Sequence, residues 1–223
     1  MREKFDEQLK LLKQKLTEMS SLCQSAISGA SEALALNDKN VSKKIMNMDA
    51  QIDSMEREIE RLCITLFMQQ QPVARDLRHI TSALKMITDL ERIGDQASDI
   101  CEIVLSFKDG CKIELPEHIE RMAGTAMKMV NMSLEAYVEK DEKKADECIK
   151  CDDIVDELFS KVKEDISKMI SEKTTCVDMA LSYLMIAKYF ERIGDHATNI
   201  AEWAEFSVTG KHRKVDKVEF YNM

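Results

Sequence analysis

Apolar residues recur at alternating steps of four and three along much of the chain, which is the spacing of one buried face of an α-helix. The first stripe comprises Phe5, Leu9, Leu12, Leu16, Met19, Cys23, Ala26, Ala30 and Ala33. The second comprises Val41, Ile45, Met48, Ile52, Met55, Ile59, Leu62 and Leu66. Asn37 and Asp38 interrupt the pattern and can cap the helix that follows. The two stripes therefore predict two long helices joined by a tight turn.

The third stripe contains an acid where an apolar residue is due. It begins with Val73, Leu77, Ile80, Leu84 and Ile87, directly after Gln71 and Pro72, which end the preceding helix. The next position of the stripe is Glu91. This break in the pattern is the first indication of a functional site.

The second half of the chain predicts three more helices after a linker that includes residues 108–110. Pro116 suits the first turn of the fourth helix, which ends near Lys140 and carries Ile119, Met122, Ala126, Met129, Ser133 and Ala136. The fifth opens at Asp141 and carries Cys148, Val155, Val162 and Ile166; the sixth spans about Cys176 to Phe206. No clear period follows Gly210.

An internal repeat divides these six helices into two sets of three. Residues 91–102 recur as residues 191–202, with the Glu-Arg-Ile-Gly-Asp run identical in both copies. On the preceding helices Asp38, Asp49 and Asp53 recur as Asp141, Asp152 and Asp156. The predicted fold is all-α, with two tandem three-helix bundles at 1–107 and 116–209 and a loose C-terminal tail at 210–223.

Composition agrees with this fold class and narrows the function. Only six Gly and two Pro in 223 residues leave little turn chemistry. A net charge of -9 argues against a nucleic-acid partner, which needs a concentrated basic surface. The first residues lack a signal peptide's apolar core and no run of about 18 apolar residues occurs, so we expect a cytoplasmic protein. Seven Cys without a regular framework indicate reduced thiols, with the Cys148–Cys151 pair expected in core packing.

Acids stack along one strip of the third helix in each half. A step of four turns only about 40° around a helix, so such groups share a face. The third helices carry Glu91, Asp95 and Asp99, then Glu191, Asp195 and Asn199. The second helices add Asp49 with Asp53, and Asp152 with Asp156. Facing strips of this kind predict an oxygen-lined slot in each half.

Like charges in such a slot repel by about 4 kcal/mol per pair at 4 Å with an effective dielectric near 20. A bound metal ion relieves this, and carboxylates suit magnesium, manganese, iron or zinc. The alternative is that the acids are ordinary solvated faces, paired with Arg92, Arg192 and lysines. Gly94 and Gly194, each costly in a helix interior, indicate close approach of a neighbour or tight helix packing.

Two further classes of protein compete with a non-enzymatic metal-binding protein. A carboxylate-bridged di-metal oxidase in a helical bundle characteristically adds Glu-x-x-His motifs, and the chain has none. A metal-free helical adaptor would use its apolar faces and fifteen Met residues to bind partners. No HExxH, P-loop or dinucleotide fingerprint occurs, so we expect no enzymatic activity.

The repeated segments DLERIGDQASDI and YFERIGDHATNI resemble the paired signatures of the PhoU family, and QQQPVARDLR resembles the segment that precedes the first signature. The resemblance implies metal held by the acids of each half, and Asp99 departs from the asparagine usual at its position. It also implies negative regulation of phosphate-starvation signalling, through the ATPase component of a phosphate ABC transporter and a sensor histidine kinase. Contact with the membrane would run through these partners only, and we expect a homodimer.

Overall fold

The computed structural model describes residues 2–70, 73–107 and 115–213, and these form seven α-helices without a strand. The first half contains α1 (Arg2–Leu36), α2 (Lys39–Gln70) and α3 (Ala74–Ser106). The second contains α4 (Glu117–Glu139), α5 (Glu142–Lys150), α6 (Asp152–Ser171) and α7 (Val177–Thr209). The predicted linker at 108–110 and most of the predicted tail lie outside the described residues.

The predicted cap at Asp38 is confirmed, and Asp141 caps a helix at the equivalent place in the second half. The Asp38 carboxylate accepts hydrogen bonds from the backbone N–H groups of Asn40 at 2.8 Å and Val41 at 3.2 Å. Asp141 accepts from the backbone of Lys143 and Lys144 at 2.9 and 3.2 Å. Each aspartate satisfies donors that a helix start leaves without a partner, so the two halves turn in the same way.

The helix predicted from Asp141 onward is interrupted once, at Cys151, and becomes α5 and α6. The Cys151 carbonyl accepts from both Ile154 and Val155, at 3.1 and 3.2 Å, which tightens the turn locally. No proline or glycine marks this position, so the apolar period gave no sign of the break. The interruption places Asp152 in the first turn of α6.

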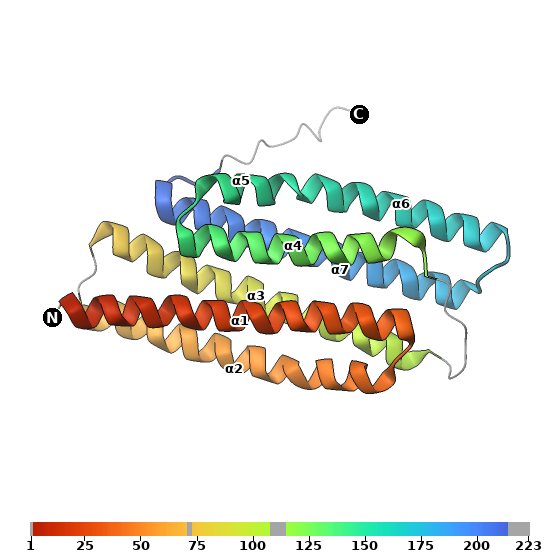
Figure 1. Cartoon of the computed structure of the whole chain (residues 1–223), viewed down its shortest axis with the longest axis horizontal. Coiled ribbons are helices and arrows are strands. Elements are labelled where there is room, and N and C mark those ends of the chain that lie inside the picture. The colour runs from red at the N-terminus through yellow and green to blue at the C-terminus, as the bar shows by residue number, and fades with distance from the viewer. Residues whose placement is uncertain (1, 71–72, 108–114, 214–223) are drawn as a thin grey trace, which may run out of the picture.

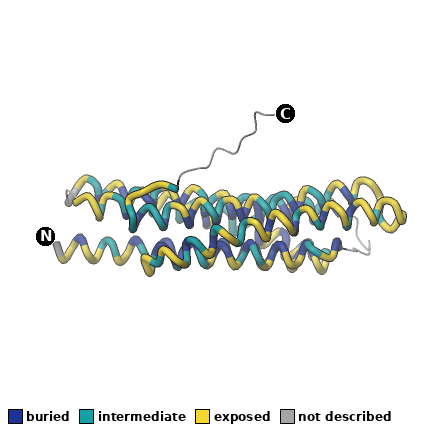
Figure 2. Tube along the Cα trace, turned by 90° about the horizontal axis from the view of Figure 1, so that it is seen from above, coloured by how far each residue is buried: buried dark blue, intermediate teal, exposed yellow. Residues whose placement is uncertain are grey.

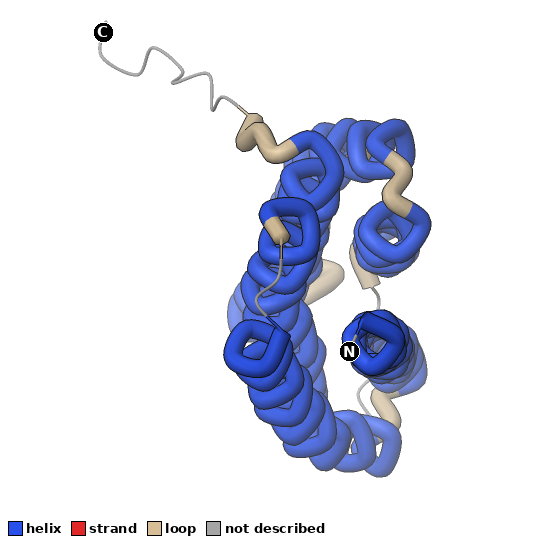
Figure 3. The backbone as a smooth tube through the Cα atoms, turned by 90° about the vertical axis from the view of Figure 1, so that its left-hand side faces the viewer, coloured by secondary structure: helices blue, strands red, loops and turns tan. Residues whose placement is uncertain are grey.

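The helices form two bundles that pack side by side (Figure 1). Figure 3 shows α1 and α4 on one side, α3 and α7 on the other, and α2 and α5/α6 at the two outer edges. The central helices α3 and α7 run in opposite directions along their contact (Figure 1). The predicted all-α fold of two tandem three-helix bundles is confirmed.

The apolar stripes face inward and form one continuous core across both halves (Figure 2). Leu12, Leu16 and Ile52 are fully buried. The start of the third stripe is an exception, since Val73 is 60% exposed and Leu77 is 45% exposed. The apolar pattern was therefore wrong about a buried face at the start of α3. None of the described helices has the length and apolarity needed to cross a membrane.

Candidate metal centre

The acids of the first half converge between α2 and α3. Burial raises the pKa of Asp49 above its usual range, and the charges of Asp95, Asp53 and Asp99 raise it further. Burial and then Asp95 likewise raise the pKa of Glu91. The five acids expected in this slot are thus coupled to one another electrostatically across α2 and α3.

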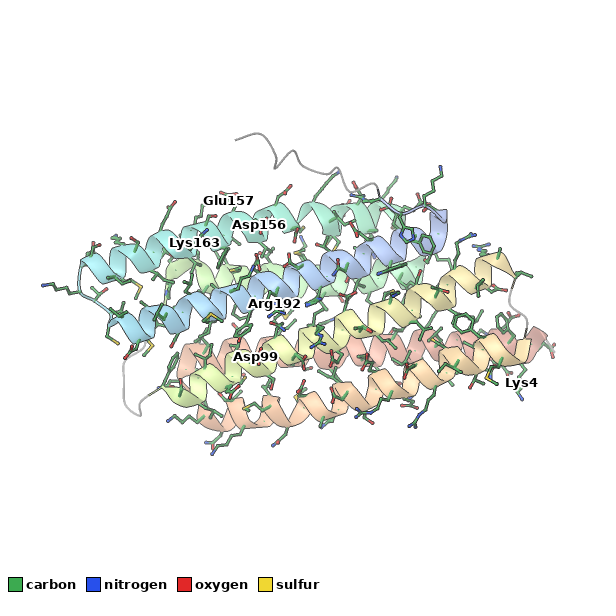
Figure 4. The ribbon with its side chains drawn as sticks, turned by 180° about the vertical axis from the view of Figure 1, so that it is seen from behind. Lys4, Asp99, Asp156, Glu157, Lys163 and Arg192 are labelled. Carbon is green, nitrogen blue, oxygen red and sulfur yellow. The ribbon has the colours of Figure 1, made fainter. Side chains whose placement is uncertain are left out.

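The second half repeats the arrangement between α6 and α7. Burial, followed by the charges of Asp195 and Asp156, raises the pKa of Asp152 to about 6. Burial and then Glu191 raise the pKa of Asp195, against an opposing effect of Lys188. Asp156 projects from α6 in Figure 4. Two clusters of repelling carboxylates therefore occupy equivalent places in the two halves.

Side chains of the protein itself neutralise part of each cluster. Arg92 donates from Nη1 to Asp95 Oδ2 at 3.0 Å, and its Nε lies 3.5 Å from Glu91 Oε2. Arg57 Nη1 lies 3.7 Å from Asp53 Oδ2. In the second half Lys188 donates to both carboxylate oxygens of Glu191. The ion pairs raised as an alternative are thus present, and they are partly exposed.

These pairs leave a deeper acid without a partner. Asp49 Oδ1 is buried and accepts no hydrogen bond within the described part of the chain. As the side chains stand, no three Asp, Glu, His or Cys residues among those described are arranged as a ligand set. The donors nevertheless fit a hard cation in type and charge, because carboxylate oxygens are its preferred ligands and an orphaned buried one has most to gain.

The two mid-helix glycines have different surroundings. A Cβ on Gly94 would lie 2.8 Å from Ile52 Cδ1 and 3.4 Å from Asp49 Oδ1. A Cβ on Gly194 would meet only Val155, at 3.4 Å or more. Gly94 therefore lets α2 approach α3 closely beside the acids, whereas Gly194 has room for a methyl group.

Two of the predicted ligands lie at the contact between the halves. Asn199 donates from Nδ2 to Asp89 Oδ1 at 3.1 Å. The Tyr189 hydroxyl and Arg192 both lower the pKa of Asp99, against the stronger effects of burial and Asp95 that raise it. Figure 4 shows Asp99 on α3 and Arg192 on α7. Asp99 thus borders both the acid cluster and the other half, while Asn199 is engaged by α3.

Asp89 is a polar residue of this contact that the sequence patterns did not single out. Besides Asn199 it binds His196, whose Nδ1 lies 2.9 Å from Asp89 Oδ1. Asp89 corresponds to Tyr189 in the repeat, so no identity between the copies marks it. His196, which directly follows Asp195, therefore lies at the interface of α3 and α7.

Known proteins share this fold over nearly the whole chain. The family profile described as "PhoU domain" matches residues 16–104 and again 119–204. The chain is 37% identical to the "Phosphate-specific transport system accessory protein PhoU homolog" of Clostridium acetobutylicum, over 93% of this chain and 95% of that protein. It is 33% identical to homolog 1 of Thermotoga maritima, over 94% and 91% of the two chains. The crystal structure of PhoU from Pseudomonas aeruginosa superposes with a TM-score of 0.86 at 29% identity, covering 93% of this chain and all of the other.

These matches extend over both halves and agree in sequence and in fold. The architecture defines a tandem helical-bundle protein with an acidic cluster in each repeat. The chain belongs to the PhoU family.

Proposed function

We propose that this protein is a non-enzymatic accessory regulator of phosphate uptake that binds metal ions and damps phosphate-starvation signalling. Full-length similarity to proteins named as accessory to the phosphate-specific transport system supports the regulatory role. The observation that supports metal binding is the pair of carboxylate clusters at matching positions of the two repeats.

The metal would be held by Asp49, Asp53, Glu91 and Asp95 in the first half, with Asp99 at the margin, and by Asp152, Asp156, Glu191 and Asp195 in the second. When bound it would supply positive charge that cancels the repulsion among these carboxylates. The donor set suits magnesium, manganese, iron or zinc. The extra charge of Asp99, where the second half has Asn199, predicts unequal affinities in the two halves.

The charge of each acidic cluster also affects how closely its two helices pack. The acids of each half lie on two different helices, so their repulsion pushes α2 from α3 and α6 from α7. Cancelling that repulsion draws each pair together and fixes the outer faces of the bundles. We propose that these faces contact the ATPase component of a phosphate ABC transporter and a sensor histidine kinase in the cytoplasm, as a homodimer.

Replacement of Asp95 and Asp195 by Asn tests this function. The double variant should lose stoichiometric metal after purification without chelators, and with it binding to the purified ATPase component and repression of a phosphate-starvation reporter. Asp178→Asn with Glu172→Gln is the matched control, since both residues are exposed and lie outside the clusters. Unchanged partner binding and repression in the metal-free variant would refute the link between metal and regulation.

The competing functions give different results in the same preparations. The oxidase predicts oxygen consumption by the ferrous-loaded protein. The metal-free adaptor predicts only traces of metal together with full partner binding. Sedimentation equilibrium of the wild type tests the homodimer.

A further inference from the structure

A positively charged cavity lies at the end of the molecule where the two halves meet. Its volume is about 200 Å³, and its walls come from α1, α3, α7 and the residue that follows α4. Figure 1 shows the first turns of α1 and α3 and the last turns of α4 and α7 at this end. Four cationic side chains line the cavity: Lys10, Lys13, Arg75 and Lys140. On a chain with a net charge of -9, such a concentration of positive charge indicates a specific role.

The four cations outnumber the two acids that line this cavity. Asp6 and Asp76 also line it, yet among the described residues neither forms an ion pair with the four cations. Lys13 donates a hydrogen bond from Nζ to the Val138 carbonyl at 3.0 Å, and this neutral acceptor does not offset the charge of the ammonium group. Burial lowers the pKa of Lys13 and the charge of Lys140 lowers it further. The cations therefore repel one another across the cavity.

His79 lines the same cavity, and one of its ring nitrogens is buried without a partner. Its side chain is 7% exposed, and its ring stacks on Tyr137 at a centroid distance of 4.3 Å. Nε2 makes no hydrogen bond within the described part of the chain. Burial, and then the charges of Lys140, Lys13 and Arg75, lower the pKa of His79 to about 3. The imidazole is thus neutral at pH 7 and leaves one unused ring nitrogen beside three cations.

We infer that this cavity is a binding site for a phosphate group, held by Arg75, Lys140, Lys10 and Lys13 with a hydrogen bond from His79. A planar guanidinium and several ammonium groups match a compact oxyanion that carries more than one negative charge. A liquid water molecule occupies about 30 Å³, so the cavity has room for a phosphate group and several waters. A neutral imidazole can donate from Nε2 without adding to the repulsion.

The bound anion would connect the halves, because Arg75 and His79 belong to the first and Lys140 to the second. The inference rests on the cavity and not on the regulatory function proposed above. If phosphate failed to bind, the metal-dependent role would stand; if that role failed, a measured phosphate affinity would stand.

Calorimetric titration with inorganic phosphate at fixed ionic strength tests the site, with glycerol 3-phosphate as a second probe. Saturable binding of either probe to the wild-type protein is expected. The relative affinities of the two probes show whether the site prefers free phosphate or a phosphate ester. Arg75→Ala and Lys140→Asn should each weaken binding by about tenfold or more, the loss of one charge-assisted contact. Asn is chosen at position 140 because Lys140 has a φ of 60°, which asparagine tolerates.

Lys4→Ala is the matched control, since Lys4 lies on α1, is exposed and does not line the cavity (Figure 4). It should bind phosphate as the wild type does. His79→Phe keeps a stacked ring and removes the nitrogen, and should weaken binding by about threefold to tenfold. Absence of binding to the wild type, or equal affinities in wild type, Arg75→Ala and Lys140→Asn, would overturn the site. Unchanged affinity in His79→Phe would overturn the hydrogen bond assigned to the imidazole.

Discussion

The two repeat glycines should respond to the same substitution with opposite signs. At Gly94 a methyl group would sit 2.8 Å from Ile52 Cδ1 and 3.3 Å from Ile52 Cγ2, and Ile52 is fully buried. At Gly194 the nearest atom is Val155 Cγ1 at 3.4 Å, an ordinary contact. Both positions lie inside helices, so both gain the intrinsic preference of alanine over glycine.

The magnitudes follow from two opposing effects. Alanine stabilises a helix interior by about 1 kcal/mol relative to glycine. Overpacking in a filled core costs about 1–3 kcal/mol. Gly194→Ala should therefore raise the free energy of unfolding by about 0.5–1 kcal/mol, whereas Gly94→Ala should lower it by about 1 kcal/mol.

Chemical denaturation followed by circular dichroism measures both differences. Ile52→Val removes Cδ1, the atom that collides with the new methyl group, and alone should cost about 0.5–1.5 kcal/mol. Combined with Gly94→Ala it should cost less than the sum of the single changes, with a coupling of about 1 kcal/mol. Equal stabilisation by the two glycine substitutions, or strict additivity with Ile52→Val, would show that helix separation at Gly94 is not set by this contact.

Three further changes test other features of the structure. The folded-state pKa of His79, about 3, lies below its unfolded value, so the contribution of His79 to stability is lost as pH falls below about 6.5. Between pH 7 and pH 5 the free energy of unfolding of the wild type should therefore fall by about 2 kcal/mol more than that of His79→Phe, as measured by denaturant titration. The contribution of Asp152 to stability depends on pH in the opposite direction. Its folded-state pKa of about 6 lies above the unfolded value, so this contribution is lost as pH rises through 6. Asp152→Asn should therefore stabilise the metal-free protein at pH 7 by about 1 kcal/mol after screening by solvent, and Asp153→Asn, an exposed neighbour, should not. Asp141→Ala removes the cap of α5 and should lower the melting temperature by about 2–4 °C, the equivalent of about 1 kcal/mol. The control Glu142→Ala should change the melting temperature by no more than about a degree. Equal effects of the two substitutions would argue against the cap.

The sequence was sufficient to predict the helices and the repeat because both depend on local periodicity. A stripe such as Leu12, Leu16 and Met19 defines the buried face whatever the partner. The caps at Asp38 and Asp141 follow from side-chain chemistry within one turn. The acids of α2 and α3 could be expected to meet because adjacent antiparallel helices are packed along their stripes.

The contact between the halves could not be predicted in the same way. A helical step of eight positions turns about 80°, so Asp99 and Asn199 point well away from Glu91 and Glu191, toward the neighbouring bundle. Periodicity does not tell which face of α3 meets α7, and so Asp89 carried no signal. The cationic cavity could not be predicted either, since its walls come from four separated segments and no motif joins them.

The pairing of α3 with α7 also bears on which halves of two chains could pair with each other. In the structure the position of Asp89 on one central helix contacts the position of Asn199 on the other. If two first halves paired through α3 in the same manner, Asp89 of one copy would face Asp99 of the other, twice per assembly. Two like charges in a half-buried contact are unfavourable by several kcal/mol when no cation lies between them. Divergence of the two repeats at positions 99 and 199 thus discourages pairing between two first halves and favours the pairing of a first half with a second half.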